Sequence, residues 1–255
     1  MTLTFILLAT LIGGVLSVLV AAGLSTALLS RVVPHLVSLS TGVLLGTALG
    51  HVLPEAFEGA ASTHALFLTL LGGLLFFFLL EKVELYRHTH HHEGDGHAHH
   101  HHFDRDQAGR GGLAVLVGDS VHNFCDGVLI AAAFLTDPHL GWMTALAAIA
   151  HEIPQEVGDY LVLLNAGFTR ARALAYNLLS GLAAVLGGVL GYYLIQPFSA
   201  LLPYLMVVAA SCFVYVAVAD LIPQLQRRLP WRATASQLLW LAVGLAATFA
   251  LPNGH

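Results

Sequence analysis

Two short stretches of this 255-residue chain carry histidine, acid and amide side chains at helical spacing: GDSVHNFCDG (118–127) and HEIPQEVGDY (151–160). Residues three or four positions apart share one face of a helix, so each stretch would present its polar groups as a cluster. Two imidazoles, a carboxylate and an amide oxygen that converge from two helices match the four-ligand sites of a borderline ion such as Zn²⁺. The residues concerned are Asp119, His122, Asn123 and Asp126 in the first stretch, and His151, Glu152, Gln155, Glu156 and Asp159 in the second.

The segments that must position these residues are strongly apolar. The chain is 57% hydrophobic and 10% charged, with a mean hydropathy of +0.77. Apolar runs of about 20 residues recur, and each can cross a bilayer core of about 30 Å as a helix. We predict an all-α polytopic membrane protein, a single transmembrane domain over residues 1–255. Its eight predicted spans are residues 4–29, 35–56, 64–86, 112–135, 140–164, 171–195, 201–222 and 235–252.

Both polar stretches therefore fall inside predicted spans, and residue 152 is the midpoint of the fifth. Ionisable groups at that depth cost about 2.5–3.5 kcal/mol each on insertion scales, which makes them functional suspects. Pro154 has no N–H for the carbonyl of Ala150, so we expect that carbonyl to be unpaired and the helix to kink. Irregular backbone at membrane depth is tolerated where it lines a site. We therefore prefer a cation site to hydrogen bonds that merely join two helices.

The basic residues predict the orientation. All ten Lys and Arg lie at or in alternate connections, whereas the connections 57–63, 136–139 and 196–200 carry none. The positive-inside rule then makes the basic loops cytoplasmic and both termini extracytoplasmic. The first segment lacks a basic n-region and is expected to be a retained helix. We expect an integral membrane protein, and the short chain suits a bacterial inner (plasma) membrane.

Three further features are weaker signals. His51 and Glu55 on the second span, and Asp220 on the seventh, are either interfacial caps or parts of an entry or exit route. The connection 88–110 is a His-rich cytoplasmic loop, either a solvated linker or a multi-site metal chelator. Its histidines are His88, His90, His91, His92, His97, His99, His100, His101 and His102. Glycines four apart on the second span (Gly42, Gly46, Gly50) and the sixth (Gly187, Gly191) are typical of close helix packing.

HNFCDG and HEIPQEVGDY resemble the paired signatures HNxxDG and HExPxExGD of the ZIP (Zrt-, Irt-like protein) family of divalent metal transporters. GHVLPEAF, VADLIPQL, the eight spans and the His-rich loop look like further family features, so the resemblance covers essentially the whole chain. It implies a transporter domain with an inverted repeat of helices 1–3 and 6–8 around helices 4–5. It also implies import of Zn²⁺, with Cd²⁺, Fe²⁺ and Mn²⁺ as further candidates, into the cytoplasm between helices 4 and 5.

The resemblance also implies ligands. The first metal would be held by His122, Asp126, His151 and Gln155, and a second by Asn123 and Glu152 with Asp126 bridging. Two positions depart from the family pattern. Gln155 stands where His or Glu is usual, which weakens or broadens the first site for Zn²⁺. Ala184 or a neighbour stands where some members supply a sixth-helix carboxylate, which makes a stable second site doubtful.

Two alternatives from other classes remain open. An intramembrane zinc protease would use HExxH, but position 155 is Gln and Pro154 interrupts the helix that would hold both ligands. A metal exporter of the cation-diffusion type would usually have six spans and cytoplasmic termini. We expect a transporter and not an enzyme. Its expected partners are a divalent metal ion and the lipid bilayer, with no nucleic acid, and a homodimer stays open.

Overall fold

The computed structural model describes residues 1–23, 26–59, 61–89, 105–226 and 230–250, with side chains left out at 21–22, 26–31, 81, 83–89 and 105–115. All regular secondary structure in these ranges is helical, as predicted. The elements are α1 (Thr2–Gly23), α2 (Thr26–Thr47), the π-helical η1 (Ala48–Val52), α3 (Leu53–Glu58), α4 (Thr63–Thr89), α5 (Arg105–Thr136), α6 (Pro138–Asn165), α7 (Arg170–Ile195), the 3₁₀ turn η2 (Ser199–Leu201), α8 (Leu202–Tyr215), the π-helical η3 (Val216–Leu221), α9 (Ile222–Leu225) and α10 (Trp231–Ala250).

Because α2, η1 and α3 follow one another without a break, as do α8, η3 and α9, the described residues form eight long helical segments. Six of them are long and apolar enough to cross a membrane. The other two are α5 and α6, which carry the polar stretches. With 32 and 28 residues they are about 48 and 42 Å long, longer than the bilayer core. The all-helical architecture is thus confirmed, and six apolar helices of this length are consistent with a polytopic membrane protein.

Two predicted boundaries differ clearly from the structure: α5 begins at Arg105 and not at residue 112, and the break between the first two spans is displaced. The first span was expected to run to residue 29, but α1 ends at Gly23 and α2 begins at Thr26. Arg31 therefore lies within α2, and Pro34 is an internal residue of that helix. The second span was predicted to begin at residue 35, directly after Pro34. A proline inside a membrane helix is tolerated where neighbouring groups satisfy the freed carbonyl, so the helix can begin before it.

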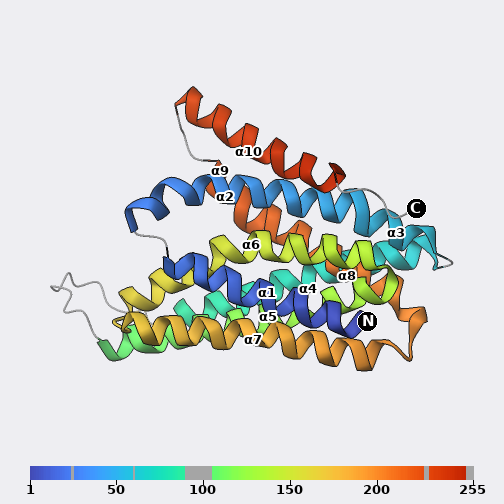
Figure 1. The fold of residues 1–255 in the computed structure, drawn as a ribbon, viewed down its shortest axis with the longest axis horizontal. Coiled ribbons are helices and arrows are strands. Elements are labelled where there is room, and N and C mark those ends of the chain that lie inside the picture. Colours follow the sequence, from blue (N-terminus) through green and yellow to red (C-terminus); the bar gives the residue numbers. More distant parts are fainter. Residues whose placement is uncertain (24–25, 60, 90–104, 227–229, 251–255) are drawn as a thin grey trace.

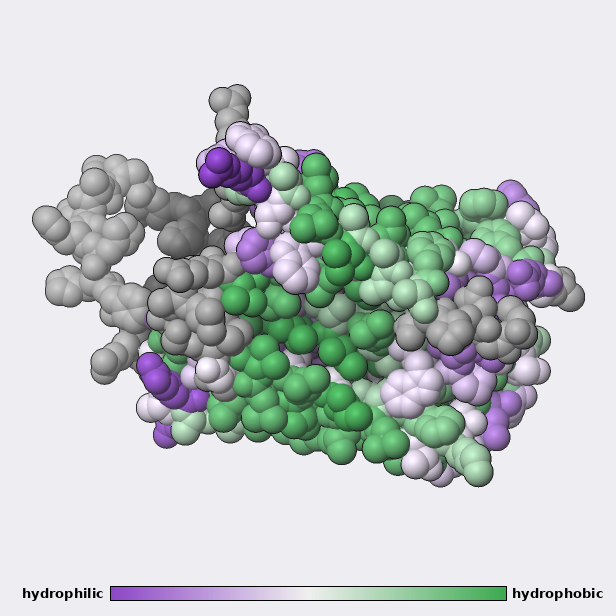
Figure 2. Space-filling model, turned by 45° about the horizontal axis from the view of Figure 1, so that its top comes forward, coloured by the Kyte–Doolittle hydropathy of each residue, from purple (hydrophilic) through white to green (hydrophobic). Residues whose placement is uncertain are grey.

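The long helices run side by side along the long axis of the molecule (Figure 1). The start of α1 and the end of α10 lie at the same end of the bundle, as an even number of passes requires. Figure 2 shows a broad band of hydrophobic residues across the middle of one face, with hydrophilic residues toward both ends. This surface suits a protein whose middle lies in hydrocarbon and whose ends lie in water.

The helices form two groups. One group contains α1, α5, α6 and α7, which pack extensively on one another; in the other, α2 packs on α10 and α4 packs on α8. The groups meet mainly where α2 crosses α6 and where α8 contacts α5. Both polar stretches belong to the first group, so one compact four-helix unit positions them.

Glycine allows two of these helix pairs to approach closely. A Cβ on Gly127 of α5 would collide with the backbone of Ala184 in α7, and a Cβ on Gly187 would collide with the backbone of Phe124. On the other side, a Cβ on Gly42 of α2 would strike the backbone of Leu241 in α10. The predicted small-residue faces are thus the α5–α7 and α2–α10 contacts.

Candidate metal centre

Four predicted ligands converge between α5 and α6. The Nε2 atoms of His122 and His151 are 3.0 Å apart, and His151 Nε2 is 3.1 Å from Asp126 Oδ2. Glu152 Oε1 lies 4.0 Å from His122 Nε2 and 3.9 Å from His151 Nε2. One ligand atom from each of the four residues lies within 4.8 Å of the others. Three of the residues are buried and His122 is partly buried.

These separations suit a small tetrahedral ion. With Zn–N and Zn–O bonds of about 2.0–2.1 Å, neighbouring ligand atoms of a tetrahedral site are about 3.3 Å apart. The two shortest separations, 3.0 and 3.1 Å, are close to that value. Glu152 stands further out and would need a small side-chain movement to bind the same ion. The donor set of two imidazoles and two carboxylates is one that Zn²⁺ uses.

Hydrogen bonding orients His151 toward the cluster. Its Nδ1 lies 2.9 Å from the backbone carbonyl oxygen of Ala147, one turn earlier in α6. With the Nδ1 proton donated to this carbonyl, the neutral ring turns the lone pair of Nε2 toward His122 and Asp126. A backbone acceptor behind a ligand histidine is the arrangement usual in metal sites.

The carboxylates of the cluster are buried and have few partners. Neither oxygen of Glu152 has a hydrogen-bond partner among the residues that the structure describes, and Asp126 pairs with His151. Buried polar atoms are normally paired, because leaving them unpaired costs free energy. A cation bound among these oxygens would supply the missing interaction, so the residues fit a metal ion.

Two predicted ligands, Asn123 and Gln155, turn their amide nitrogens toward Asp119. Asn123 Nδ2 donates to Asp119 Oδ1 at 3.1 Å, and Gln155 Nε2 donates to the same atom at 3.0 Å. The amides thereby fix the Asp119 side chain between α5 and α6. Only the oxygen of each amide is left to bind a metal, because both nitrogens donate to Asp119. Gln155 therefore stays a predicted ligand, through its oxygen.

The carbonyl group that Pro154 leaves without a donor in α6 has a partner that the sequence did not predict. The carbonyl of Ala150, which cannot bond within α6, accepts a hydrogen bond from the Ser40 hydroxyl of α2. The carbonyl expected to be unpaired is therefore satisfied across the boundary between the two helix groups. Ser40 lies in a run of small polar residues, SLSTG (38–42), which was the available signal.

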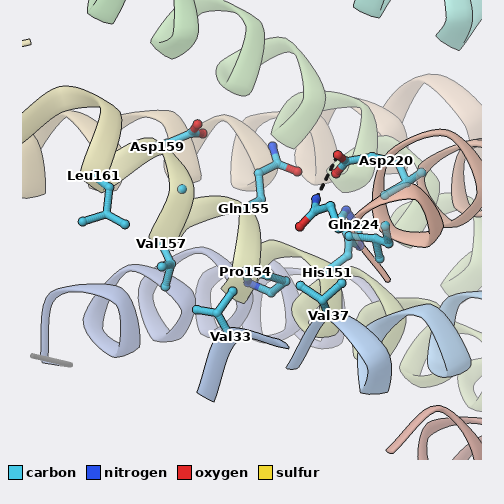
Figure 3. A pocket seen from close by; sticks show the side chains of 13 residues that line it. Val33, Val37, His151, Pro154, Gln155, Val157, Asp159, Leu161, Asp220 and Gln224 are labelled. Carbon is cyan, nitrogen blue, oxygen red and sulfur yellow. Dashed lines mark hydrogen bonds between the residues drawn. The ribbon is translucent and has the colours of Figure 1, made fainter. Parts of the chain in front are cut away.

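A cavity of about 470 Å³ adjoins the cluster at His151 and Gln155. Asp159 of α6 and Asp220 of η3 also line it, so two of the residues predicted for an entry or exit route share one space with His151 of the candidate cluster. Figure 3 shows Asp220 and Gln224, joined by a hydrogen bond, next to the Gln155 side chain, with Asp159 further away on α6. The walls come from α2, α6, η3 and α9, so the cavity lies between the two helix groups.

A second, much smaller cavity of about 20 Å³ lies on the other side of the cluster. Asn123, Asp126 and Glu152, the residues implied for a second metal, line it together with Ala184 of α7. The space is large enough for one water-sized particle. The methyl group of Ala184 thus faces the place that a further carboxylate would occupy.

Other predicted residues lie apart from the cluster. His51, in η1, packs its ring 5.3 Å from that of Phe249 and 6.2 Å from that of His139, a residue the sequence did not single out. Glu55 lies in the short helix α3. His88 belongs to α4, but its side chain is not described. The remaining loop histidines, 90–92, 97 and 99–102, lie outside the described residues.

This chain is similar in sequence to known proteins. The model of the ZIP zinc transporter family matches residues 1–110 and 84–252. The chain is 40% identical to the zinc transporter ZIP10 of Homo sapiens over 111 residues, which are 44% of this chain and 13% of that protein. It is 30% identical to the zinc transporter ZIP13 of Pongo abelii over 229 residues, 83% of this chain and 64% of that protein. It therefore covers only part of these relatives. The family match nevertheless extends over nearly all of its length, and the chain belongs to the ZIP zinc transporter family, whose members are transporters and not enzymes.

Proposed function

We propose that this protein imports Zn²⁺ into the cytoplasm and that the ion binds between α5 and α6. The observation that carries the proposal is the buried convergence of His122, Asp126, His151 and Glu152 in a membrane-spanning helix bundle. Asn123 and Gln155 complete the proposed ligand set through their amide oxygens. A site of this kind between two membrane helices is costly unless an ion uses it.

The ligand chemistry supports a transition metal. Neutral imidazole suits Zn²⁺ and its neighbours, and carboxylate and amide oxygens widen the range toward harder ions. Cd²⁺, Fe²⁺ and Mn²⁺ are therefore proposed as weaker substrates. The amide of Gln155 is a poorer zinc ligand than imidazole. It therefore favours release of the bound ion and a broader range of metal substrates.

The proposed route runs from the end of the bundle that carries both termini to the end that carries the basic residues. On the outer side, His51 and Glu55 lie near the α3 end of the second span. On the inner side, the cavity lined by Asp159 and Asp220 leads from His151 toward the end of α6. The loop histidines 88–102 would receive the ion there. The positive-inside rule supports the assignment of this side to the cytoplasm.

The division into two helix groups supports a carrier mechanism. The proposed ligands all lie on α5 and α6, in the group completed by α1 and α7, and the 470 Å³ cavity separates this group from α2, η3 and α9. Movement of the first group against the second, by an elevator or a rocking motion, would close this cavity and open the outer side. The inverted repeat expected for helices 1–3 and 6–8 is the symmetry that such carriers use.

The test is uptake of radioactive zinc by proteoliposomes that contain the full chain. We expect saturable uptake that His122→Ala abolishes and that His64→Ala, an exposed histidine at the start of α4, leaves intact. Competition by excess Cd²⁺, Fe²⁺ and Mn²⁺ ranks the substrates. Equal uptake in the wild type and His122→Ala would refute the assignment of the site.

The direction of transport needs a separate measurement. Single cysteines at Thr169 and Ser199, which flank opposite ends of α7, should be labelled by membrane-impermeant reagent from opposite sides of intact cells. We expect Ser199→Cys to react from outside and Thr169→Cys only after permeabilisation. The reverse pattern would contradict the proposed topology and favour export.

A further inference from the structure

A second group of acids lies beside the histidine cluster. Oxygen atoms of Asp119, Glu152 and Glu156 lie within 4.8 Å of one another, and the three residues are 3%, 4% and 0% exposed. Asp119 comes from α5, and the two glutamates are one turn apart on α6. Glu152 also belongs to the histidine cluster, so the two groups adjoin.

The oxygens of this acid group have little else to bind. Both oxygens of Glu152 lack hydrogen-bond partners within the described part of the chain. The Glu156 carboxylate is faced by the Asn177 amide, and the Asp119 carboxylate by the Ser180 hydroxyl. Oδ1 of Asp119 also accepts from Asn123 and Gln155, and these two hydrogen bonds hold the carboxylate in place.

An amide from a third helix faces the same group. Asn177 of α7 is fully buried, and its Nδ2 donates to the backbone oxygen of Glu156 at 3.2 Å, next to the Glu156 carboxylate. Its Oδ1 has no hydrogen-bond partner among the described residues. Ser180, one turn further along, donates to the backbone oxygen of Asn177 at 2.9 Å. The buried Oδ1 of Asn177 is therefore a further unpaired oxygen, on the amide whose nitrogen lies against Glu156.

No fixed positive charge from the helices that carry these acids can balance them. The sequence has no Lys or Arg between residues 111 and 169, which includes all of α6 and the described side chains of α5. Buried carboxylates at this separation repel one another strongly, because the surroundings screen little. A bound cation removes both the repulsion and the unpaired oxygens.

We propose that Asp119, Glu152, Glu156 and Asn177 form a second divalent-cation site with oxygen ligands only. Such a site favours a harder ion, with Mn²⁺ as the representative, over the ions that imidazole prefers. It differs from the second site implied by the family resemblance, which would surround the small cavity at Ala184. Asn177 is seven residues before Ala184, two turns along the same face of α7. The inference extends the proposed function but does not need the histidine cluster to be the transport site.

The test is a titration of the purified full chain with Mn²⁺, followed by electron paramagnetic resonance, which detects free and bound ion separately. We expect a tightly bound Mn²⁺ that survives His122→Ala, the variant that impairs the histidine cluster, and that Glu156→Gln or Asn177→Leu weakens roughly tenfold or more. Glu156→Asp, which keeps the charge, should restore part of the affinity. A thermal unfolding curve and zinc binding by the same variants show that the fold and the histidine cluster survive.

Two outcomes would overturn the proposal. One is that the wild type binds no Mn²⁺ tightly, in which case the acids hold protons instead. The other is that Mn²⁺ binding is lost in His122→Ala and kept in Glu156→Gln, which would place the ion in the histidine cluster. Neither Mn²⁺ result would decide whether the protein transports zinc. Conversely, the effect of His122→Ala on zinc uptake would not decide whether the oxygen site binds Mn²⁺.

Discussion

The helix pairs α5–α7 and α2–α10 pack in the same way but lie beside different kinds of side chain. In both α5–α7 and α2–α10, glycines on one helix face the backbone of the other so closely that a methyl group would not fit. Beside α5–α7 lie buried carboxylates and the two histidines of the cluster. The α2–α10 pair carries neutral polar side chains without carboxylates, and α10 exposes Leu238 and Leu239. Glycine packing by itself therefore indicates contact and not function.

The difference lies in how polar side chains are satisfied. In α2–α10, hydroxyl groups bond back to their own helix: Ser38 to the carbonyl of Pro34, Thr41 to that of Val37 and Thr248 to that of Leu245. On α2 the buried atoms without a partner in the described structure, His35 Nδ1 and Thr47 Oγ1, belong to neutral side chains that stand singly.

Beside α5–α7, by contrast, the carboxylates of Asp126, Glu152 and Glu156 make no bond to their own helix in the described structure. A hydroxyl group that is satisfied within its own helix only stabilises packing, whereas a group of buried carboxylates is available to an ion.

The largest effect expected from this comparison is on zinc affinity. His151→Ala should weaken Zn²⁺ binding by more than about 100-fold, because loss of even an outer-shell partner costs about 10–100-fold. The matched change in the other pair is His35→Ala, since His35 of α2 stacks on Trp240 of α10 with ring centroids 5.9 Å apart. It should leave affinity within a factor of about two. Isothermal titration with Zn²⁺ measures both, and similar losses in the two variants would remove the distinction.

A smaller effect, on thermal stability, is expected when a methyl group is introduced between the helices of either pair. Gly127→Ala and Gly42→Ala each place a methyl group against the backbone of the facing helix, at a cost of about 1–3 kcal/mol from overpacking. Both should unfold at lower temperature in detergent than Gly72→Ala, where an added Cβ meets nothing within 4 Å. Only Gly127→Ala should also weaken Zn²⁺ binding, because Asp126 is its neighbour. A zinc defect in Gly42→Ala would show that the pairs are coupled.

The smallest effect concerns two serines two positions apart on α2. Ser40→Ala leaves the Ala150 carbonyl without its donor and should lower stability by about 0.5–2 kcal/mol, the range of interhelical hydrogen bonds in membranes. Ser38→Ala removes only a bond within its own helix and should be nearly silent. Thermal unfolding of the two variants against the wild type compares them. Equal stability would mean that the contact across the helix groups contributes nothing.

The fold was predictable because the apolar runs are continuous and long. Each of the eight predicted spans overlaps one helical segment of the structure. The boundaries differ most between the first two spans, where α1 ends at Gly23 and α2 begins at Thr26, and at the start of α5, which is Arg105 and not residue 112. Hydropathy cannot detect a break within a continuous apolar segment, and a proline in a membrane helix does not have to end it.

The sequence by itself determined the membrane class and the two ligand-bearing helices, because helical periodicity alone brings residues three or four apart to one face. Only the tertiary structure decided which groups meet across helices. It directed the Gln155 nitrogen to Asp119, gave the Ala150 carbonyl to Ser40 and brought Asn177 to Glu156. These contacts join residues 21 to 110 positions apart, and the rotation and depth of the packed helices fix them. No local pattern encodes that geometry.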